Sequence, residues 1–125
     1  MIDEKKPVYM IGIVAKLVGV HPQTLRFYEK EGLITSARTE GQTRLYSERE
    51  FRKIRKIVYL TKKKGINIAG VKEILNMEED VYNLLKTLKE FLQEERFEEF
   101  LKILKNVPFK SLDIEEIIKK LEEEV

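Results

Sequence analysis

Residues 9–29 read YMIGIVAKLVGVHPQTLRFYE. Apolar side chains in the first half recur near the 3.6-residue period of an α-helix, which predicts a short helix over about residues 11–18. Gly19 ends this helix, because glycine readily adopts the left-handed conformation at a helix C-terminus. Pro22 suits the first position of a second helix, over about residues 22–31. Two short helices joined by such a turn form a helix-turn-helix unit.

A small β-hairpin is predicted next along the chain. Residues 34–38 and 44–46 are short extended segments around the sequence Thr39-Glu40-Gly41-Gln42-Thr43. Gly41 is the residue there that most readily takes a positive φ, so we expect it to form the turn. A hairpin this short is marginal alone and must pack against the helices, as a wing does.

Further helices follow the hairpin. Ser47 and Glu50 have the spacing of a capping box, which predicts a helix over about residues 48–64. Asn67 can cap the next helix, which we expect to end near Met77.

The C-terminal part is predicted to be helical as well. Apolar stripes run over residues 81–92 and 97–107, and they are out of phase with each other. Asp113 and Glu116 form a second capping box for a last helix, with its apolar face over residues 114–121.

Charge divides the chain into a basic and an acidic part. Residues 1–77 hold 16 Lys and Arg against 8 Asp and Glu, a balance of +8. Residues 78–125 hold 8 against 14, a balance of −6. This asymmetry is typical of a nucleic-acid reader joined to an assembly segment. We therefore expect a DNA-binding domain over residues 8–77 and a helical dimerisation or regulatory segment over residues 78–125.

Composition argues against several other classes of protein. The chain has no cysteine and one histidine, which argues against thiolate metal sites and redox sensing. It shows no nucleophile–base pair and no glycine-rich phosphate loop, so we expect no enzyme, no metal and no cofactor. No apolar run approaches the roughly 18 residues of a membrane span, and the start lacks an apolar signal segment. We expect a cytoplasmic protein.

Several linked motifs resemble the MerR superfamily of transcription regulators. The resemblance lies in residues 9–29 and in the hairpin, RTEGQTRLYS, at residues 38–47. Within the superfamily, HPQTLR at residues 21–26 and GINIAGV at residues 65–71 resemble the heat-shock repressors. The resemblance covers about residues 8–77. It implies a mostly α fold, namely a winged helix-turn-helix with a small β-hairpin wing and a C-terminal helical dimerisation segment.

The second predicted helix carries the first candidate DNA contacts. It would enter the major groove with its N-terminal half towards the base edges, where Gln23 and Thr24 point outward. Glutamine can pair bidentately with adenine, and threonine offers a hydroxyl and a methyl group. The resemblance places Arg26 and the Tyr28 hydroxyl at the DNA backbone, although Tyr28 can alternatively be a core residue. Phe27 stands where many members have a second tyrosine, and we interpret it as a packing residue.

The wing carries a second set of candidate contacts. It would lie along the flanking backbone, with Arg38 and Arg44 near phosphates or the minor groove. Gln42, in the turn between them, is counted with these contacts. Tyr46 is interpreted mainly as a brace for the wing, with DNA contact as a secondary role.

Two further basic features border this surface. Lys62, Lys63 and Lys64 precede a turn that resembles a second wing, where they either contact phosphates or form a solvated helix end. His21 is interpreted as a turn or helix-entry residue, close enough to DNA to contribute a contact.

Specific recognition by one short helix requires two copies. We therefore expect a homodimer on double-stranded DNA with an inverted repeat. MerR relatives dimerise through a long antiparallel coiled coil, whereas the stripe over residues 81–92 spans under two heptads. We expect a shorter helix pair with residues 97–107 or 114–121 folded back on it; alternatively, these helices only complete a monomer's core.

The resemblance to heat-shock repressors implies repression of chaperone genes with a DnaK-type chaperone as co-repressor. One alternative is a nitrogen-control repressor of the same superfamily, whose wing also has a Thr-Glu-Gly turn. Another is an excisionase-like architectural DNA-binding protein, which has a winged helix but often no dimer segment.

Overall fold

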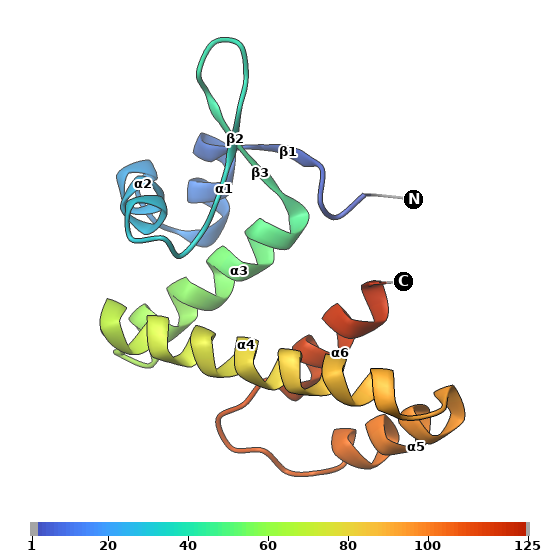
Figure 1. Cartoon of the computed structure of the whole chain (residues 1–125). Helices are drawn as coiled ribbons and strands as arrows, with labels where there is room; N and C mark the ends of the chain where they lie inside the picture. The colour runs from blue at the N-terminus through green and yellow to red at the C-terminus, as the bar shows by residue number, and fades with distance from the viewer. Residues whose placement is uncertain (1–2, 125) are drawn as a thin grey trace. The chain divides into compact units, whose positions relative to one another are not determined.

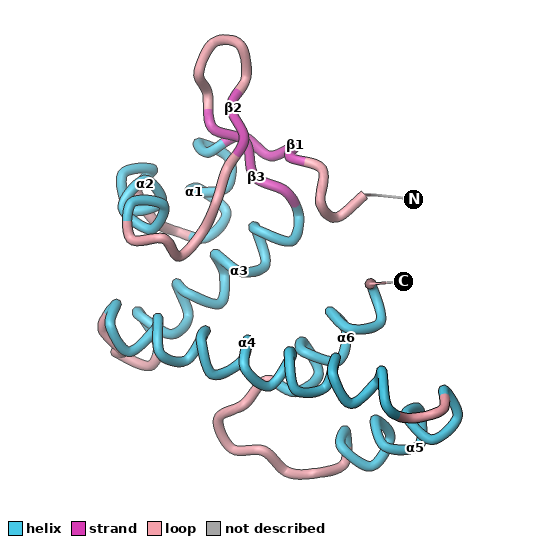
Figure 2. Tube along the Cα trace, viewed as in Figure 1, coloured by secondary structure: helices cyan, strands magenta, loops and turns pink. Residues whose placement is uncertain are grey.

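The computed structural model describes residues 3–124, and contacts within the chain divide it into two compact units, one up to Val71 and one from Lys72 onward (Figures 1 and 2). The elements in chain order are β1 (Pro7–Met10), α1 (Ile11–Val18), α2 (Pro22–Lys30), β2 (Ala37–Arg38), β3 (Arg44–Ser47), α3 (Glu48–Val58), the π-helical turn η1 (Tyr59–Lys63), α4 (Ile68–Phe91), α5 (Glu94–Lys105) and α6 (Ile114–Glu123). Within residues 3–124, none of the helices combines the length and apolar character that a membrane crossing requires.

The helix-turn-helix is confirmed, and local sequence signals set its ends. α1 stops at Gly19, which has a φ of 75° and whose N–H donates to the Ala15 and Lys16 carbonyls. α2 opens with Pro22 in its first turn. α3 opens with Ser47, whose Oγ accepts a hydrogen bond from the Glu50 N–H at 3.1 Å. These caps fix where each helix begins because they satisfy backbone groups that have no partner within the helix.

The sheet has three strands, in the order β1-β3-β2, where the sequence predicted two. β1 pairs antiparallel with β3 from Pro7 opposite Ser47 to Met10 opposite Leu45. Proline is tolerated here because β1 is an edge strand and Pro7 is its first residue. β3, the middle strand of the sheet, is thus hydrogen-bonded on both sides, and this stabilises a wing that would be marginal alone.

The turn of the wing takes its positive φ at Gln42 rather than at Gly41. Gln42 has a φ of 66°, and Gly41 is not among the residues with positive φ. The Gln42 N–H donates to the Thr39 carbonyl at 2.9 Å, and the Thr39 N–H donates to the Thr43 carbonyl at 2.9 Å. This is the pattern of a three-residue hairpin loop, in which the last loop residue is left-handed. The prediction for Gly41 was wrong because this loop needs its positive φ one residue later.

The helix predicted over residues 48–64 changes character near its end. α3 is regular to Val58 and continues as η1, in which the Lys64 N–H donates to the Tyr59 carbonyl at 3.2 Å. A π-helical turn widens the helix by one residue, and such turns are frequent at functional sites.

α4 is longer than predicted. It runs without interruption from Ile68 to Phe91, past the end expected near Met77, because no glycine or proline occurs between residues 71 and 92. Asn67 caps its start as expected, since its Oδ1 accepts from the Gly70 N–H at 2.9 Å.

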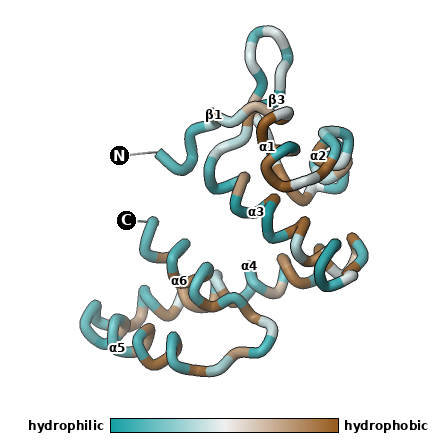
Figure 3. The backbone as a smooth tube through the Cα atoms, turned by 180° about the vertical axis from the view of Figure 1, so that it is seen from behind, coloured by the Kyte–Doolittle hydropathy of each residue, from teal (hydrophilic) through white to brown (hydrophobic). Residues whose placement is uncertain are grey.

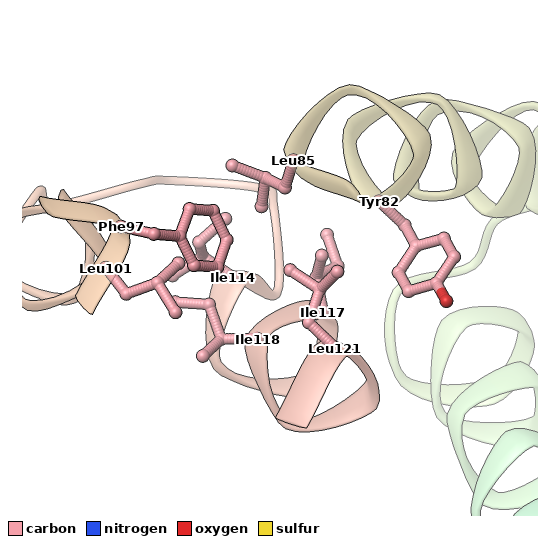
Figure 4. Close-up of a cluster of buried hydrophobic side chains, with 8 residues drawn as sticks. All are labelled: Tyr82, Leu85, Phe97, Leu101, Ile114, Ile117, Ile118 and Leu121. Atoms are coloured by element: carbon pink, nitrogen blue, oxygen red, sulfur yellow. The ribbon is translucent and has the colours of Figure 1, made fainter. Parts of the chain in front are cut away.

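The second unit has an apolar core of its own (Figure 4). Side chains from α4, α5 and α6 meet there: Tyr82, Leu85, Phe97, Leu101, Ile114, Ile117, Ile118 and Leu121. α6 begins at the predicted capping box, where the Glu116 N–H donates to the Asp113 Oδ1 at 3.2 Å. The C-terminal helices therefore fold back on α4 and complete a core within one chain, which is the alternative that the sequence left open; the dimeric helix pair stays a prediction.

Truncating this core should destabilise the second unit. We expect Leu101→Ala to lower the free energy of unfolding by about 2–5 kcal/mol, because Leu101 is 2% exposed and its loss leaves a cavity. Ile103→Ala, on the same helix but 67% exposed, should change it by less than about 0.5 kcal/mol. Urea unfolding followed by circular dichroism checks both; equal losses would contradict the assigned core.

Candidate nucleic-acid interface

The recognition helix α2 begins with a histidine cap. The His21 Nδ1 accepts a hydrogen bond from the Gln23 N–H at 3.0 Å. In the neutral ring with Nδ1 as acceptor, the proton lies on Nε2, which is left as a donor on an exposed side chain. His21 is thus the helix-entry residue that the sequence indicated.

Two of the predicted contact residues are joined on the outer face of α2. The Arg26 Nη1 donates to the Gln23 Oε1 at 2.9 Å, one helical turn apart. Gln23 is exposed, and Thr24 beside it is partly exposed. The bond uses the amide oxygen of Gln23, so its NH₂ group remains a donor for a base edge or a phosphate.

The two aromatic residues of α2 differ in burial, and Tyr28 takes the core position that the sequence left as its alternative. Tyr28 is 4% exposed and belongs to the core, so its burial contradicts a backbone contact by its hydroxyl. Phe27 is 45% exposed, and its ring centroid lies 6.3 Å from that of Tyr28, so it packs only in part. The reason is helical geometry, because adjacent positions differ by about 100° around the helix and only one can face the core.

The wing places two arginines opposite each other. Arg38 on β2 is the register partner of Arg44 on β3. Directly opposed like charges destabilise a strand pair unless other charges compensate them. Arg38 is exposed, whereas Arg44 is partly buried with its Nε 2.6 Å from the Glu29 Oε2. The exposed Gln42 belongs to the loop that joins β2 and β3 (Figure 1), and Figure 3 shows this loop as pale to hydrophilic.

Tyr46 braces the wing from inside. Its side chain is fully buried, and its hydroxyl donates to the Glu29 Oε2 at 3.1 Å. Burial, and then the charge of Glu29, raise the pKa of Tyr46, so the phenol keeps its proton and remains a donor. The bracing role is confirmed, and burial contradicts the secondary role in DNA contact.

Glu29 is a residue that the sequence analysis missed. Its carboxylate accepts from Tyr46 and from the Ser36 Oγ, besides pairing with Arg44. One sequence signal could have found it: Glu29 lies in the last turn of α2, where the helix dipole disfavours a negative charge.

Among Lys62, Lys63 and Lys64, Lys62 has a structural role. The Lys62 Nζ donates to the Gly19 carbonyl at 2.8 Å, which ties η1 to the turn of the helix-turn-helix. Lys63 and Lys64 are exposed. A shallow, open hollow beside this tie is lined by Lys16, His21, Thr24 and Lys62, among others.

This hollow collects positive charge at the start of the recognition helix. Lys16, which the sequence analysis did not select, adds to the charge of Lys62 there. Such a concave basic surface fits a phosphate backbone. Within residues 3–124, no group of three or more His, Cys, Asp or Glu is arranged to hold a metal ion.

The family to which the chain belongs follows from comparison with known proteins. Residues 9–78 match the family of MerR HTH family regulatory proteins. The chain belongs to the MerR family. It is a DNA-binding transcription regulator with a winged helix-turn-helix, and the family is not enzymatic.

Individual relatives cover different shares of this MerR-family chain. A Streptomyces coelicolor protein that carries the name heat shock protein HspR is 43% identical over 83 residues, which are 66% of this chain and 55% of that protein. The transcriptional regulator GlnR of Bacillus anthracis is 35% identical over 100 residues, 80% of this chain and 76% of GlnR. The regulator ZntR of Escherichia coli is 34% identical over 73 residues, 58% of this chain and 51% of ZntR.

Two substitutions should separate general from sequence-dependent binding. We expect Arg44→Ala to weaken binding to a mixed-sequence duplex and to reduce the slope of log K against log salt by about 0.9, since one phosphate contact is lost. Gln23→Ala should leave that slope unchanged and relax base preference. Fluorescence anisotropy across a salt series, together with selection from a random duplex pool, checks both.

The matched control for both variants is Lys110→Ala, which removes an exposed charge from the second unit. Binding by the Arg44→Ala protein that equals the wild type at every salt concentration would remove the wing from the mechanism.

Proposed function

We propose that this MerR-family chain is a dimeric repressor of heat-shock and chaperone genes that binds an inverted-repeat operator. The observation that carries the proposal is the 43% identity with the protein named heat shock protein HspR. The motif HPQTLR at residues 21–26, which begins the recognition helix, supports the same assignment.

DNA would be read by α2 and held by the basic side chains around it. Gln23 and Thr24 would meet base edges in the major groove, and Arg26 the adjacent backbone. The wing would follow the flanking strand with Arg38 and Arg44. The second group of phosphate contacts would come from His21 and Lys62 in the hollow at the start of α2, and from the exposed Lys63 and Lys64 that follow Lys62.

Two copies would pair through an exposed apolar face of α4. Met77, Leu84 and Phe91 are spaced by seven residues and are 60%, 68% and 82% exposed. Ile74, Val81 and Leu88 lie between them at the complementary heptad positions and are partly buried, and Val81 and Leu88 also pack against the core of the second unit. Apolar side chains at both positions form the seam of a coiled coil. With Ile74 and Met77 included, the seam is longer than the stripe from residue 81 alone.

The paired α4 helices would set the spacing of the two recognition helices. The resemblance to MerR relatives supports an antiparallel pair, which relates the copies by a two-fold axis. A two-fold protein matches a DNA site with dyad symmetry, so the operator would be an inverted repeat.

A DnaK-type chaperone would act as co-repressor. This part of the proposal rests on the resemblance to heat-shock repressors. The acidic residues after position 77 would either form the surface that binds the chaperone or belong only to the dimerisation segment.

A second candidate function is nitrogen-control repression. It is favoured by the match to GlnR, which spans a larger share of both chains, 80% and 76%, than the match to HspR does. The two candidates share the fold and the wing turn, so only the bound promoters separate them.

Chromatin immunoprecipitation with sequencing in the native host, with and without heat stress, tests the regulon. Peaks at chaperone operons that are lost on heating support the proposal, and peaks at glutamine metabolism genes support the second candidate. The peaks also give the symmetry of the site. A site without a dyad, strongly bent by the protein, would favour an architectural role and contradict the dimeric repressor.

A substitution on the exposed face of α4 tests the dimer. We expect Leu84→Glu to convert the protein from a particle of about twice 14.8 kDa to one of 14.8 kDa, because two carboxylates would be buried at the seam. Asn83→Glu is the control, since it adds the same charge at the neighbouring exposed position on another face of the helix. Size-exclusion chromatography with light scattering measures both. A wild-type chain that is monomeric at all concentrations would contradict the seam.

A further inference from the structure

One carboxylate joins the recognition helix to the wing. The Glu29 Oε1 accepts a hydrogen bond from the Ser36 Oγ, in the segment that leads to β2. The Glu29 Oε2 accepts from the Tyr46 hydroxyl at 3.1 Å and lies 2.6 Å from the Arg44 Nε. Two hydrogen-bond donors and one cation from outside α2 therefore converge on a single side chain of that helix.

The position of Glu29 does not stabilise α2 itself. The residue lies in the last turn of α2, where the dipole opposes a negative charge, and its side chain is only 17% exposed. A carboxylate withdrawn this far from water requires partners, and here it has two neutral donors and one cation. The tertiary contacts therefore account for a charge that local helix stability disfavours.

We propose that Glu29 is a positioning residue for DNA binding, which holds the Arg44 guanidinium in the orientation that meets a phosphate. The inference rests on the proposed contact between the wing and DNA. Glu29 itself would touch no DNA, and it would act only through Arg44.

The geometry of the guanidinium allows Arg44 to pair with Glu29 and to contact a phosphate at the same time. Arginine offers five N–H donors in a planar fork, and Nε is the atom that lies 2.6 Å from the Glu29 carboxylate, as an ion pair without a hydrogen bond at Nε. The two Nη groups still carry donors for a phosphate oxygen, and the Arg44 side chain is 22% exposed. An arginine already fixed by a partner loses less conformational freedom when it binds.

Glu29 also compensates the charge repulsion within the wing. Arg38 and Arg44 are register partners, so their positive charges lie opposite each other before DNA arrives. The carboxylate next to Arg44 offsets this repulsion in the free protein. Phosphates would add to that compensation in the complex, because the Nη groups and Nε face different partners.

A double-mutant cycle tests the proposal. The proteins are wild type, Glu29→Gln, Arg44→Ala and the double variant, and the probe is the duplex that the wild type selects from a random pool. Glutamine keeps the size of the side chain but loses the charge and presents N–H donors where acceptors are needed. We expect each single variant to weaken binding by about tenfold and the double variant to bind no worse than Arg44→Ala.

The salt dependence separates positioning from a structural role. We expect Glu29→Gln to lower the slope of log K against log salt towards the Arg44→Ala value, by up to about 0.9, because the same phosphate contact is lost. Tyr46→Phe and Ser36→Ala are matched controls, since each removes one other hydrogen bond to the same carboxylate and leaves Arg44 paired. They should lower thermal stability and leave the slope unchanged.

Arg44→Lys tests the same idea should Glu29→Gln fail to fold. Lysine keeps the charge but has a single ammonium, which cannot occupy the Nε and Nη positions at once. We expect it to bind about as weakly as Arg44→Ala.

Three results would overturn the proposal. They are tighter binding by Glu29→Gln, which would mean that the carboxylate competes with DNA; additive losses in the double variant; and wild-type affinity in Arg44→Lys. Failure of the wild type to select any duplex would instead refute DNA recognition itself, so the two failures are distinguishable.

Discussion

The buried ring of Tyr46 is the contact on which the DNA-binding unit depends. Tyr46 is the largest fully buried side chain of the described residues, and it belongs to the middle strand of the sheet. Its ring anchors the wing in the core, while its hydroxyl reaches the carboxylate of Glu29 on the recognition helix. A short hairpin has little stability of its own, so this anchor gives the wing a fixed place relative to α2.

The charges of this unit are arranged around that anchor. Opposed arginines on the wing and the lysines beside the helix-turn-helix make a surface that repels itself in the absence of an anion. Two internal contacts moderate the repulsion: Glu29 pairs with Arg44, and Lys62 donates to the carbonyl of Gly19. Both contacts also join elements that lie apart in the sequence. The pairing of these positive charges and the connection between the elements therefore depend on the same side chains.

The second unit is built on α4, whose faces differ in burial. α4 has one face buried against α5 and α6 and another that leaves Met77, Leu84 and Phe91 exposed. A core of eight buried side chains from three helices gives the unit a basis for stability within one chain. The exposed face is then available for a second copy, which an operator with dyad symmetry would require.

The sequence by itself determined the elements whose signals are local. Caps at Gly19, Ser47, Asn67 and Asp113 lie within a few residues of the backbone groups that they satisfy, so the capped ends of their helices could be predicted from the sequence. The MerR motifs were likewise readable because they are contiguous. Only the tertiary structure decided what depends on distant partners: the pairing of β1 with β3, the burial of Tyr46, and the role of Glu29, which lies 17 residues from Tyr46. Spacing along a chain does not show which side chains meet after it folds, and for that reason sequence reasoning left two roles open for Tyr28 and missed Glu29.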